Sequence, residues 1–252
     1  MRTVRLLIEY DGTPYSGWQA QANGSTIQEE IERSINKVTG ESVRIAGSGR
    51  TDAGVHALGQ VASFRTESDI AGERFAPALN SHLPPQIAIL HSAWVPNSFH
   101  ARKSAKGKTY RYRILNRRMR PALLRDKVYH FAPDLDIAAM RTAAAHIVGE
   151  HDFYAFTPPA SERPMGYLRE VYSLEIAQQG DEIVIDVSGS GFLHNMVRII
   201  AGTLVEVGRG RMSADAIPAI IESRDRTQAG PTAPACGLYL VEVDYGEKKP
   251  SA

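Results

Sequence analysis

The sequence is poor in cysteine and in long apolar runs. Its 252 residues contain one cysteine, Cys236, which excludes an internal disulfide framework and a cysteine-based metal cage and is typical of a reducing compartment. No apolar run approaches about 18 residues, so the sequence predicts no membrane span. The opening MRTVRLLIEYDG lacks the apolar segment and cleavage site of a secretory signal and reads as a strand. We therefore expect a cytoplasmic protein.

Patterns typical of metal sites and of serine nucleophiles are also missing. The eight histidines are scattered, and His146 and His151 are not part of an HExxH pattern. Ser188-Gly-Ser190-Gly does not match the nucleophile elbow G-x-S-x-G. That stretch favours a loop that leads backbone amides into the next helix, where a phosphate can bind. The residues themselves give no support for a metal site.

Charge is balanced over the whole chain but not along it. The formal net charge is +1, whereas residues 102–127 contain eleven lysines or arginines and one acid. A basic island of this kind indicates a polyanionic partner such as a nucleic acid. The alternative is an edge strand that its charges protect from aggregation.

Apolar periodicity predicts a mixture of strands and helices. Strands are predicted within 3–13, 42–49, 58–66, 87–95, 108–115, 169–191 (a hairpin) and 237–245, and helices within 27–40, 73–85, 136–151, 192–210 and 213–225. These elements favour the α+β class, with two ferredoxin-like split β-α-β halves and a largely antiparallel mixed sheet around a central basic cleft. We place an N-terminal α/β half at 1–115 and a C-terminal α/β half at 116–252.

The helix over 27–40 has recognisable start and stop signals. Ser25 is the expected N-cap residue, and Gln28 lies three residues later in a capping-box arrangement. Gly40 marks the expected end of the helix.

The segment GSGRTDAG, residues 47–54, places a carboxylate in a tight glycine-rich loop. It matches neither GxGxxG nor the P-loop pattern, so it gives little support for a nucleotide site. Its aspartate, Asp52, is flanked by Arg50, Thr51 and His56. A lone aspartate in such a loop is often a turn or cap residue, so a functional interpretation requires partners.

Arg198 is one candidate partner for Asp52. It lies in the apolar helical stretch NMVRII, where an isolated buried charge would be costly. A carboxylate such as Asp52 would neutralise the guanidinium, which in turn would keep the aspartate ionised and aim it. The alternative is that Arg198 extends to the surface along its own alkyl chain.

Tyr110 and Tyr112 share one face of the strand KTYRYRIL with Lys108, and Arg111 and Arg113 lie on the other face. A tyrosine ring can stack on a nucleobase, and its hydroxyl can move a proton. Tyrosine also favours strands for packing alone. The basic residues between the aromatics favour nucleic acid.

Five motifs in order resemble the TruA family of tRNA pseudouridine synthases. GRTDAGVHA at 49–57 is similar to the catalytic motif of that family. The other four are EYDGTPYSGWQ at 9–19, SFHARKSAKGKTYRYRI at 98–114, GSGFLHNMVRIIAGTL at 189–204 and TAPACGLYLVEVDY at 232–245. The resemblance extends from about residue 4 to 245.

The resemblance implies an enzyme that isomerises uridines at positions 38, 39 and 40 of the tRNA anticodon stem-loop to pseudouridine. It implies no metal and no organic cofactor, and a homodimer whose tRNA contacts both subunits. It further implies that Asp52 is the catalytic nucleophile, that Tyr110 stacks on the target base and that Arg198 is the partner of Asp52.

The remaining site residues also follow from the resemblance. Arg50 corresponds to the residue that helps to hold the space of the flipped-out nucleotide, and Leu238 to an apolar residue beneath the uracil. Contacts to the tRNA backbone are expected from Lys108, Arg111, Arg117, Arg118 and Arg120 of the basic island.

The chain departs from the family pattern at two positions. His194 stands where the family often has tyrosine, and Cys236 precedes Gly237 where the family usually has two glycines. Both positions flank the inferred site, so they bear on substrate contacts rather than on the chemistry.

Other functions compete with this interpretation. A non-catalytic RNA-binding module would explain the basic island and the tyrosines, but not the aspartate in GSGRTDAG. A cofactor-free nucleoside or glycoside hydrolase would combine Asp52 with a second carboxylate, Asp11 or Asp186, although nothing in the sequence brings such a pair together. A metabolic enzyme with an unrelated small substrate is the third alternative.

Overall fold

The computed structural model describes residues 1–21, 24–159 and 166–246, which form two compact units. The first unit combines residues 1–106 with the end of the chain from Tyr239, and the second consists of residues 107–238. This division differs from the expected one at 115/116. The strand over 107–116 pairs along most of its length with the strand over 182–189, while Tyr239 and Leu240 pair with the strand that starts at His56.

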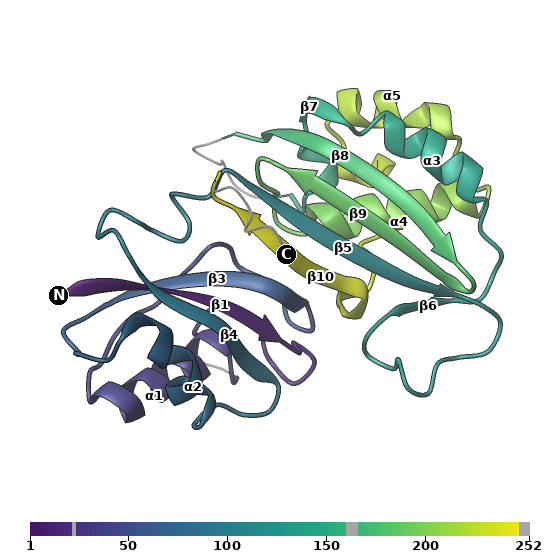
Figure 1. Ribbon diagram of the computed structural model, residues 1–252. Helices are drawn as coiled ribbons and strands as arrows, with labels where there is room; N and C mark the ends of the chain where they lie inside the picture. Colours follow the sequence, from purple (N-terminus) through teal and green to yellow (C-terminus); the bar gives the residue numbers. More distant parts are fainter. Residues whose placement is uncertain (22–23, 160–165, 247–252) are drawn as a thin grey trace. The chain divides into compact units, whose positions relative to one another are not determined.

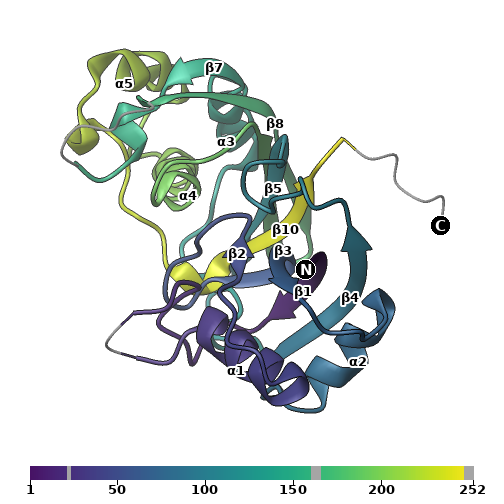
Figure 2. The same cartoon turned by 90° about the vertical axis from the view of Figure 1, so that its left-hand side faces the viewer.

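The first unit is a sheet with two helices packed on one face (Figures 1 and 2). Its elements are β1 (Arg2–Tyr10), α1 (Ile27–Thr39), β2 (Ala46–Gly47), β3 (His56–Thr66), α2 (Phe75–Asn80), β4 (Ile87–Val95) and β10 (Leu238–Asp244). The strand order is β4-β1-β3-β10, with β2 paired to β3. β1 is antiparallel to both of its neighbours, and β10 is parallel to β3.

Alternation along β1 creates the core of the first unit. Val4, Leu6 and Ile8 are fully buried because alternate residues of a strand face the same side. The apolar face of α1, with Ile27, Ile31 and Ile35, is buried as well, as its 3.6-residue period predicts.

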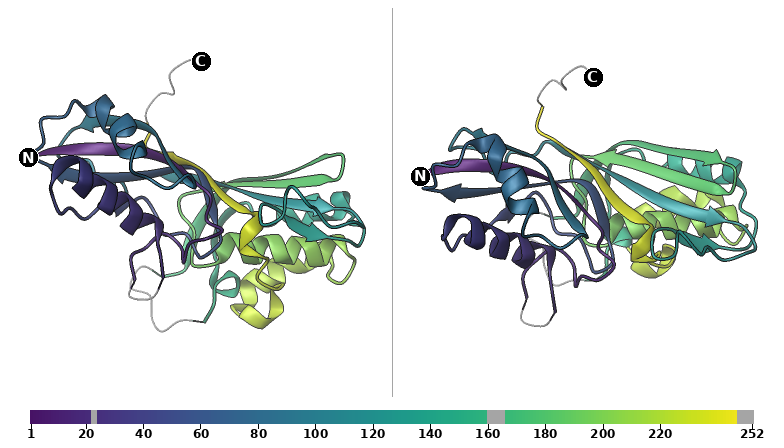
Figure 3. Two further views of the ribbon diagram at one scale, coloured as in Figure 1. Left: turned by 90° about the horizontal axis from the view of Figure 1, so that it is seen from below. Right: turned by 60° about the horizontal axis from the view of Figure 1, so that its bottom comes forward.

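The second unit also packs its helices against one face of a sheet (Figures 1 and 3). Its elements are β5 (Gly107–Asn116), β6 (Tyr129–Phe131), α3 (Ile137–Ala145), β7 (Gly149–Asp152), β8 (Leu168–Gln179), β9 (Glu182–Gly189), α4 (Met196–Gly208) and α5 (Ile217–Ser223). The antiparallel order is β5-β9-β8-β7, and β6 pairs in parallel with β5.

The α+β class and the largely antiparallel pairing confirm the prediction from sequence. The central basic cleft concerns the placement of the two units and stays a prediction.

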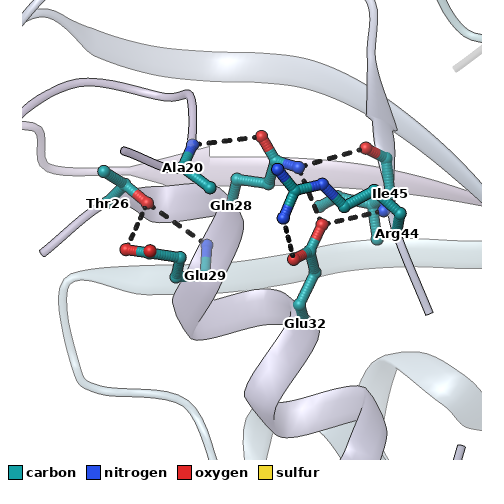
Figure 4. Close-up of polar contacts among 7 residues, drawn as sticks. All are labelled: Ala20, Thr26, Gln28, Glu29, Glu32, Arg44 and Ile45. Atoms are coloured by element: carbon teal, nitrogen blue, oxygen red, sulfur yellow. Dashed lines mark hydrogen bonds and ion pairs between the residues drawn. The ribbon is translucent and has the colours of Figure 1, made fainter. Parts of the chain in front are cut away.

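One cap prediction was wrong, because Thr26 and not Ser25 caps α1. The Thr26 hydroxyl accepts from the Glu29 backbone N–H at 3.4 Å and donates to the Glu29 carboxylate at 2.8 Å (Figure 4). The Ser25 hydroxyl donates instead to Glu30.

Candidate functional site

The GSGRTDAG segment joins β2 to β3 as an irregular loop of the first unit, and side chains of β3 hold its start. The Ser48 backbone N–H donates to the Val61 carbonyl at 2.8 Å, and its hydroxyl donates to the Gln60 amide oxygen at 2.6 Å. The Gln60 amide nitrogen donates to the Gly49 carbonyl at 3.0 Å. Hydrogen bonds to a buried neighbouring strand therefore fix the entry to the loop.

The residues on both sides of Asp52 are also fixed. The hydroxyls of Tyr10 and Thr51 are 2.7 Å apart, and the Trp18 backbone N–H donates to the Thr51 carbonyl at 3.0 Å. The Asp52 carbonyl accepts from the Val55 backbone N–H at 3.2 Å, which closes the turn. The side chain of Asp52 is partly exposed. The loop thus presents a carboxylate on a backbone that has little freedom to move.

Gly17 permits the close approach of the 10–18 segment to the loop. Its φ is +97°, which L side chains rarely adopt, and a Cβ there would lie 2.7 Å from the Thr51 carbonyl oxygen. Only glycine lets Trp18 reach the Thr51 carbonyl from this backbone. The EYDGTPYSGWQ motif therefore acts as a support for the aspartate loop.

His56 and Arg50, the other polar neighbours of Asp52 in sequence, lie in different surroundings. His56 is buried at the start of β3 and its ring stacks on Tyr239 with centroids 4.7 Å apart. Its Nδ1 is 3.2 Å from the backbone nitrogen of Gly12 and 3.2 Å from a carboxylate oxygen of Asp11. Arg50 is exposed. His56 therefore has a structural place in the sheet.

In the second unit, Tyr110 and Tyr112 are both buried residues of β5. The Tyr112 hydroxyl donates to the Pro234 carbonyl at 2.8 Å, and burial raises the pKa of Tyr112. The Tyr110 ring meets Phe192 edge-on, with centroids 5.3 Å apart. Tyr112 matches the packing interpretation. Tyr110 and Phe192 form an aromatic pair just before α4 begins.

Arg198 projects from the first turn of α4 and is held by neutral acceptors. Its Nε donates to the Ala233 carbonyl at 2.8 Å, and its Nη1 donates to the Asn195 side-chain oxygen at 2.9 Å. Asn195 caps the helix in the left-handed conformation with φ 59°, which asparagine tolerates better than most residues. The pairing of Arg198 with Asp52 joins the two units and stays a prediction.

The chain over 229–238 lies against α4 and is fixed there by close backbone contacts. The Gly230 N–H donates to the Thr203 hydroxyl at 2.9 Å, and the Ala233 N–H donates to the Arg198 carbonyl at 3.1 Å. A Cβ on Gly202 would lie 1.8 Å from the Pro231 carbonyl oxygen, so this helix position accepts only glycine. The segment that leads to Leu238 is therefore part of the α4 packing.

Arg226 is a residue of this region that the sequence did not single out. Its guanidinium donates to the carbonyls of Ala229 and Gly230 at 3.3 and 2.9 Å, and to the Thr232 hydroxyl at 3.2 Å. Three acceptors within four residues make it the clamp of the 229–232 turn. The three acceptors follow Arg226 closely in the sequence. An arginine followed by small residues is nevertheless too common a pattern to predict such a contact.

The residues at the departures from the family pattern have clear local roles. The Cys236 thiol donates to the Val128 carbonyl at 3.4 Å, and burial raises the pKa of this thiol. Leu238, the first residue of β10, is buried. The His194 side chain is exposed, while its carbonyl accepts from the Thr157 hydroxyl at 2.9 Å.

The residues of the basic island divide into paired and exposed groups. Arg111 forms a bidentate pair with Asp186, with two contacts of 2.8 Å, and Arg113 pairs with Glu182 at 2.6 and 3.1 Å. The other island residues of interest are solvent-facing to different degrees. Arg117, Arg118 and Arg120 are exposed, and Lys108 is half-buried. Arg117 also approaches Asp181 at 3.6 Å.

Within residues 1–21, 24–159 and 166–246 there is no group of three or more histidine, cysteine, aspartate or glutamate side chains that could hold a metal ion. In the same ranges, no helix has the length and apolar character needed to cross a membrane.

Comparison with known proteins gives matches over nearly the whole chain. The family model of tRNA pseudouridine synthases matches residues 6–102 and 143–246. The chain is 51% identical to tRNA pseudouridine synthase A of Ruminiclostridium cellulolyticum over 97% of its own length and 100% of that relative. It is 52% identical to tRNA pseudouridine synthase A of Acetivibrio thermocellus and 49% identical to that of Geotalea daltonii, with the same coverage.

A more distant likeness exists among solved structures. A chain in the crystal structure of a Cbf5–Nop10–Gar1 complex is 15% identical, with a TM-score of 0.39 over 81% of this chain and 45% of that one. At this level the likeness carries no argument about function.

Proposed function

The chain belongs to the tRNA pseudouridine synthase family, and from that premise we propose that it isomerises uridines of tRNA to pseudouridine. The observation that carries the proposal is the identity of about half of all residues with synthases that it matches from end to end. The targets are uridines at positions 38, 39 and 40 in the anticodon stem-loop. The reaction rearranges atoms within one nucleotide with no net oxidation or reduction, and the proposal includes no metal or organic cofactor.

Asp52 is the nucleophile in this proposal. The reaction breaks the bond between ribose and the base nitrogen, turns the uracil and rejoins it through carbon 5. A carboxylate serves this chemistry if it is ionised and aimed. The hydrogen bonds of Thr51 to Tyr10 and Trp18, with the turn that Val55 closes, support the aimed geometry. Arg198 supplies the positive partner that pairs with the Asp52 carboxylate and aims it.

The other site residues hold the nucleotide after it leaves its helix. Extruding a base costs a few kcal/mol, and stacking on an aromatic ring offsets about 1–3 kcal/mol of this. Tyr110 provides that ring, and its edge-on contact with Phe192 keeps it in place. Arg50 is exposed on the loop and helps to hold open the space of the nucleotide that has flipped out. Leu238 lies beneath the uracil.

The exposed part of the basic island contacts the tRNA backbone. Arg117, Arg118 and Arg120 are available for phosphates because they are exposed, and Lys108 lies on the same strand as Tyr110. The support for Arg111 is weaker, because its guanidinium already forms the bidentate pair with Asp186. Phosphate contacts of this kind make affinity fall steeply with salt.

The active form is a homodimer in the cytoplasm. Exposed apolar side chains beside the edge strand β7 and on its neighbour β8, namely Val148, Leu168 and Tyr172, support a surface that a second copy covers. Sedimentation of the purified chain tests the dimer, since a monomer at micromolar concentration would contradict it. The single free cysteine is compatible with a reducing compartment.

The test of the proposed function is incubation of the purified chain with an unmodified tRNA transcript, followed by mapping of pseudouridine. We expect pseudouridine at positions 38, 39 or 40 and none with Asp52→Asn, which keeps the shape of the side chain but removes its charge. The variant should lose roughly 10³-fold or more in turnover and bind tRNA as the wild type does.

Each alternative function predicts a different product. A hydrolase would release free uracil or sugar, and an RNA-binding module would bind the transcript without changing it. An enzyme with a small metabolic substrate would be insensitive to excess tRNA. Near-normal turnover of Asp52→Asn would remove Asp52 from the centre of the mechanism.

A further inference from the structure

Gln28 lies in the first turn of α1 and has a buried side-chain amide. This amide takes no part in the N-cap of the helix. Thr26 and Glu29 make the cap between them, so the expected role of Gln28 in a capping box is taken. Its side chain is nonetheless only 6% exposed. A buried amide must have its donors and acceptor satisfied by specific partners, and these partners indicate what it does.

The side chain of Gln28 contacts Glu32 on its own helix and two segments that lie before and after that helix in the sequence (Figure 4). Its Oε1 accepts from the Ala20 backbone N–H at 3.2 Å. Its Nε2 donates to the Glu32 carboxylate at 2.7 Å and to the Ile45 carbonyl at 3.5 Å. One side chain therefore connects the segment before α1 with the segment before β2.

Glu32 completes the hold on Ile45. The Glu32 Oε1 that accepts from Gln28 also accepts from the Ile45 backbone N–H at 3.0 Å, and its second oxygen is 3.5 Å from Arg44 Nη1. Both backbone groups of Ile45 are thus bound by side chains of α1. Gln28 and Glu32 thus satisfy the N–H and C=O groups of Ile45, which a neighbouring strand would satisfy within a sheet.

Both segments that Gln28 holds lead directly to the aspartate loop. Trp18, two residues before Ala20, donates its N–H to the Thr51 carbonyl, and Thr51 precedes Asp52. Ile45 leads into β2 and then to Ser48, where the loop begins. A shift of Ala20 relative to Ile45 would therefore change the position of the loop between them.

We propose that Gln28 and Glu32 are positioning residues for Asp52. They set the distance between the Ala20 segment and the Ile45 segment, which support the aspartate loop. This inference rests on the proposed function of Asp52. Gln28 acts through Ala20 and Trp18 on one side, and together with Glu32 through Ile45 on the other. Neither side chain contacts the substrate.

The first test replaces Gln28 by methionine, which has a similar shape but cannot form these hydrogen bonds. We expect Gln28→Met to lower kcat for pseudouridine formation by about 10- to 100-fold, because small displacements of a reacting group cost this much. The KM for tRNA should change by less than about twofold, since the surfaces that bind RNA stay in place.

Thr26→Ala is the matched control, because it weakens the same helix at its cap without touching Ala20 or Ile45. It should lower the Tm by several degrees and leave kcat within about twofold of wild type. If Thr26→Ala lowers kcat as much as Gln28→Met at an equal loss of Tm, Gln28 has a merely structural role and the inference is overturned.

A second pair of variants tests the proposal even if Gln28→Met folds poorly. Gln28→Glu places two carboxylates in contact, since the Gln28 amide lies 2.7 Å from Glu32, and should lower kcat at least as much as methionine does. The double variant Gln28→Glu/Glu32→Gln restores a donor between the two positions, though not the one to the Ile45 carbonyl, and should recover part of kcat. Equal kcat in the single and double variants would contradict the proposal.

Hydrogen exchange separates failure of this inference from failure of the proposed function. The Ala20 amide should exchange at least about tenfold faster in Gln28→Met, because its acceptor is gone. If the wild type makes no pseudouridine, the proposed function fails, whatever the exchange rates show. If the wild type is active and Gln28→Met retains full kcat, only the positioning role fails.

Discussion

The two irregular segments that carry predicted site residues are held in place by different chemistry. Neutral hydroxyls and amides, from Tyr10 and Gln60, hold the aspartate loop of the first unit. Guanidinium groups, from Arg226 and Arg198, hold the 229–238 segment of the second unit. Hydrogen bonds from charged donors are stronger and costlier to lose than neutral ones. The second segment is therefore expected to be the more sensitive to a single substitution.

The largest effect on stability is expected from Arg226→Gln. The shorter neutral side chain cannot reach all three acceptors, so the free energy of unfolding should fall by about 2–3 kcal/mol. Arg224→Gln is the matched control, because Arg224 is exposed and its contact with Asp152, at 3.5 Å, is a surface ion pair. That control should change stability by less than about 0.5 kcal/mol. Urea unfolding measures both, and equal losses would show that Arg226 is no clamp.

A smaller effect is expected from Tyr10→Phe in the first unit. Loss of the hydroxyl contact with Thr51 should cost about 1 kcal/mol at neutral pH. Tyr154→Phe is the control, since Tyr154 is only half-buried, and it should be close to neutral. A loss for Tyr10→Phe as large as that for Arg226→Gln would remove the distinction between neutral and charged support.

Alkaline pH tests the same residue in a second way. Burial raises the pKa of Tyr10 from its ordinary 10 to about 12. The unfolded chain therefore releases this proton first, so the stabilisation is fully present below pH 10 and is lost as pH rises through about 12. The wild type should lose about 2–3 kcal/mol over this range that Tyr10→Phe does not lose. Parallel curves for the two proteins would contradict the burial of this hydroxyl.

The smallest change in stability is expected where arginines are exposed and make at most a surface ion pair, as Arg117 does with Asp181. Replacing Arg117, Arg118 and Arg120 together by glutamine should change the free energy of unfolding by less than about 1 kcal/mol. The same change should weaken binding to all tRNAs and flatten the dependence of affinity on salt. Replacement of Arg113, which is paired with Glu182, is the control and should leave the salt slope nearly unchanged. An unchanged slope in the triple variant would exclude these arginines from phosphate contact.

Local patterns predicted the elements of the fold well but their long-range pairing less well. The apolar period of α1 and its stop at Gly40, which has φ 76°, were evident from the sequence. The capping residue was misplaced by one position because Ser25 and Thr26 are chemically alike. The division into units at 106/107 differs from the expected one at 115/116. The return of β10 to β3 was not visible in the sequence, because pairing between distant strands leaves no local signal.

The candidate site shows the same limit at the level of single residues. The motif around Asp52 was recognisable, but the reason that Gln28 is buried was not. A glutamine three residues after a serine suggests a cap, while its actual partners, Ala20 and Ile45, meet only once the chain has folded. Arg111 was expected at the RNA because its charge is visible in the sequence and its pairing with Asp186 on β9 is not.

The sequence by itself determined the α+β elements, the glycine-rich aspartate loop and the family, because these depend on periodicity and on motifs of neighbouring residues. Only the tertiary structure decided which polar side chains support that loop and which arginines are already paired. The physical reason is that hydrogen bonds and ion pairs act over about 3 Å. They therefore depend on which distant segments the packing of the core brings together.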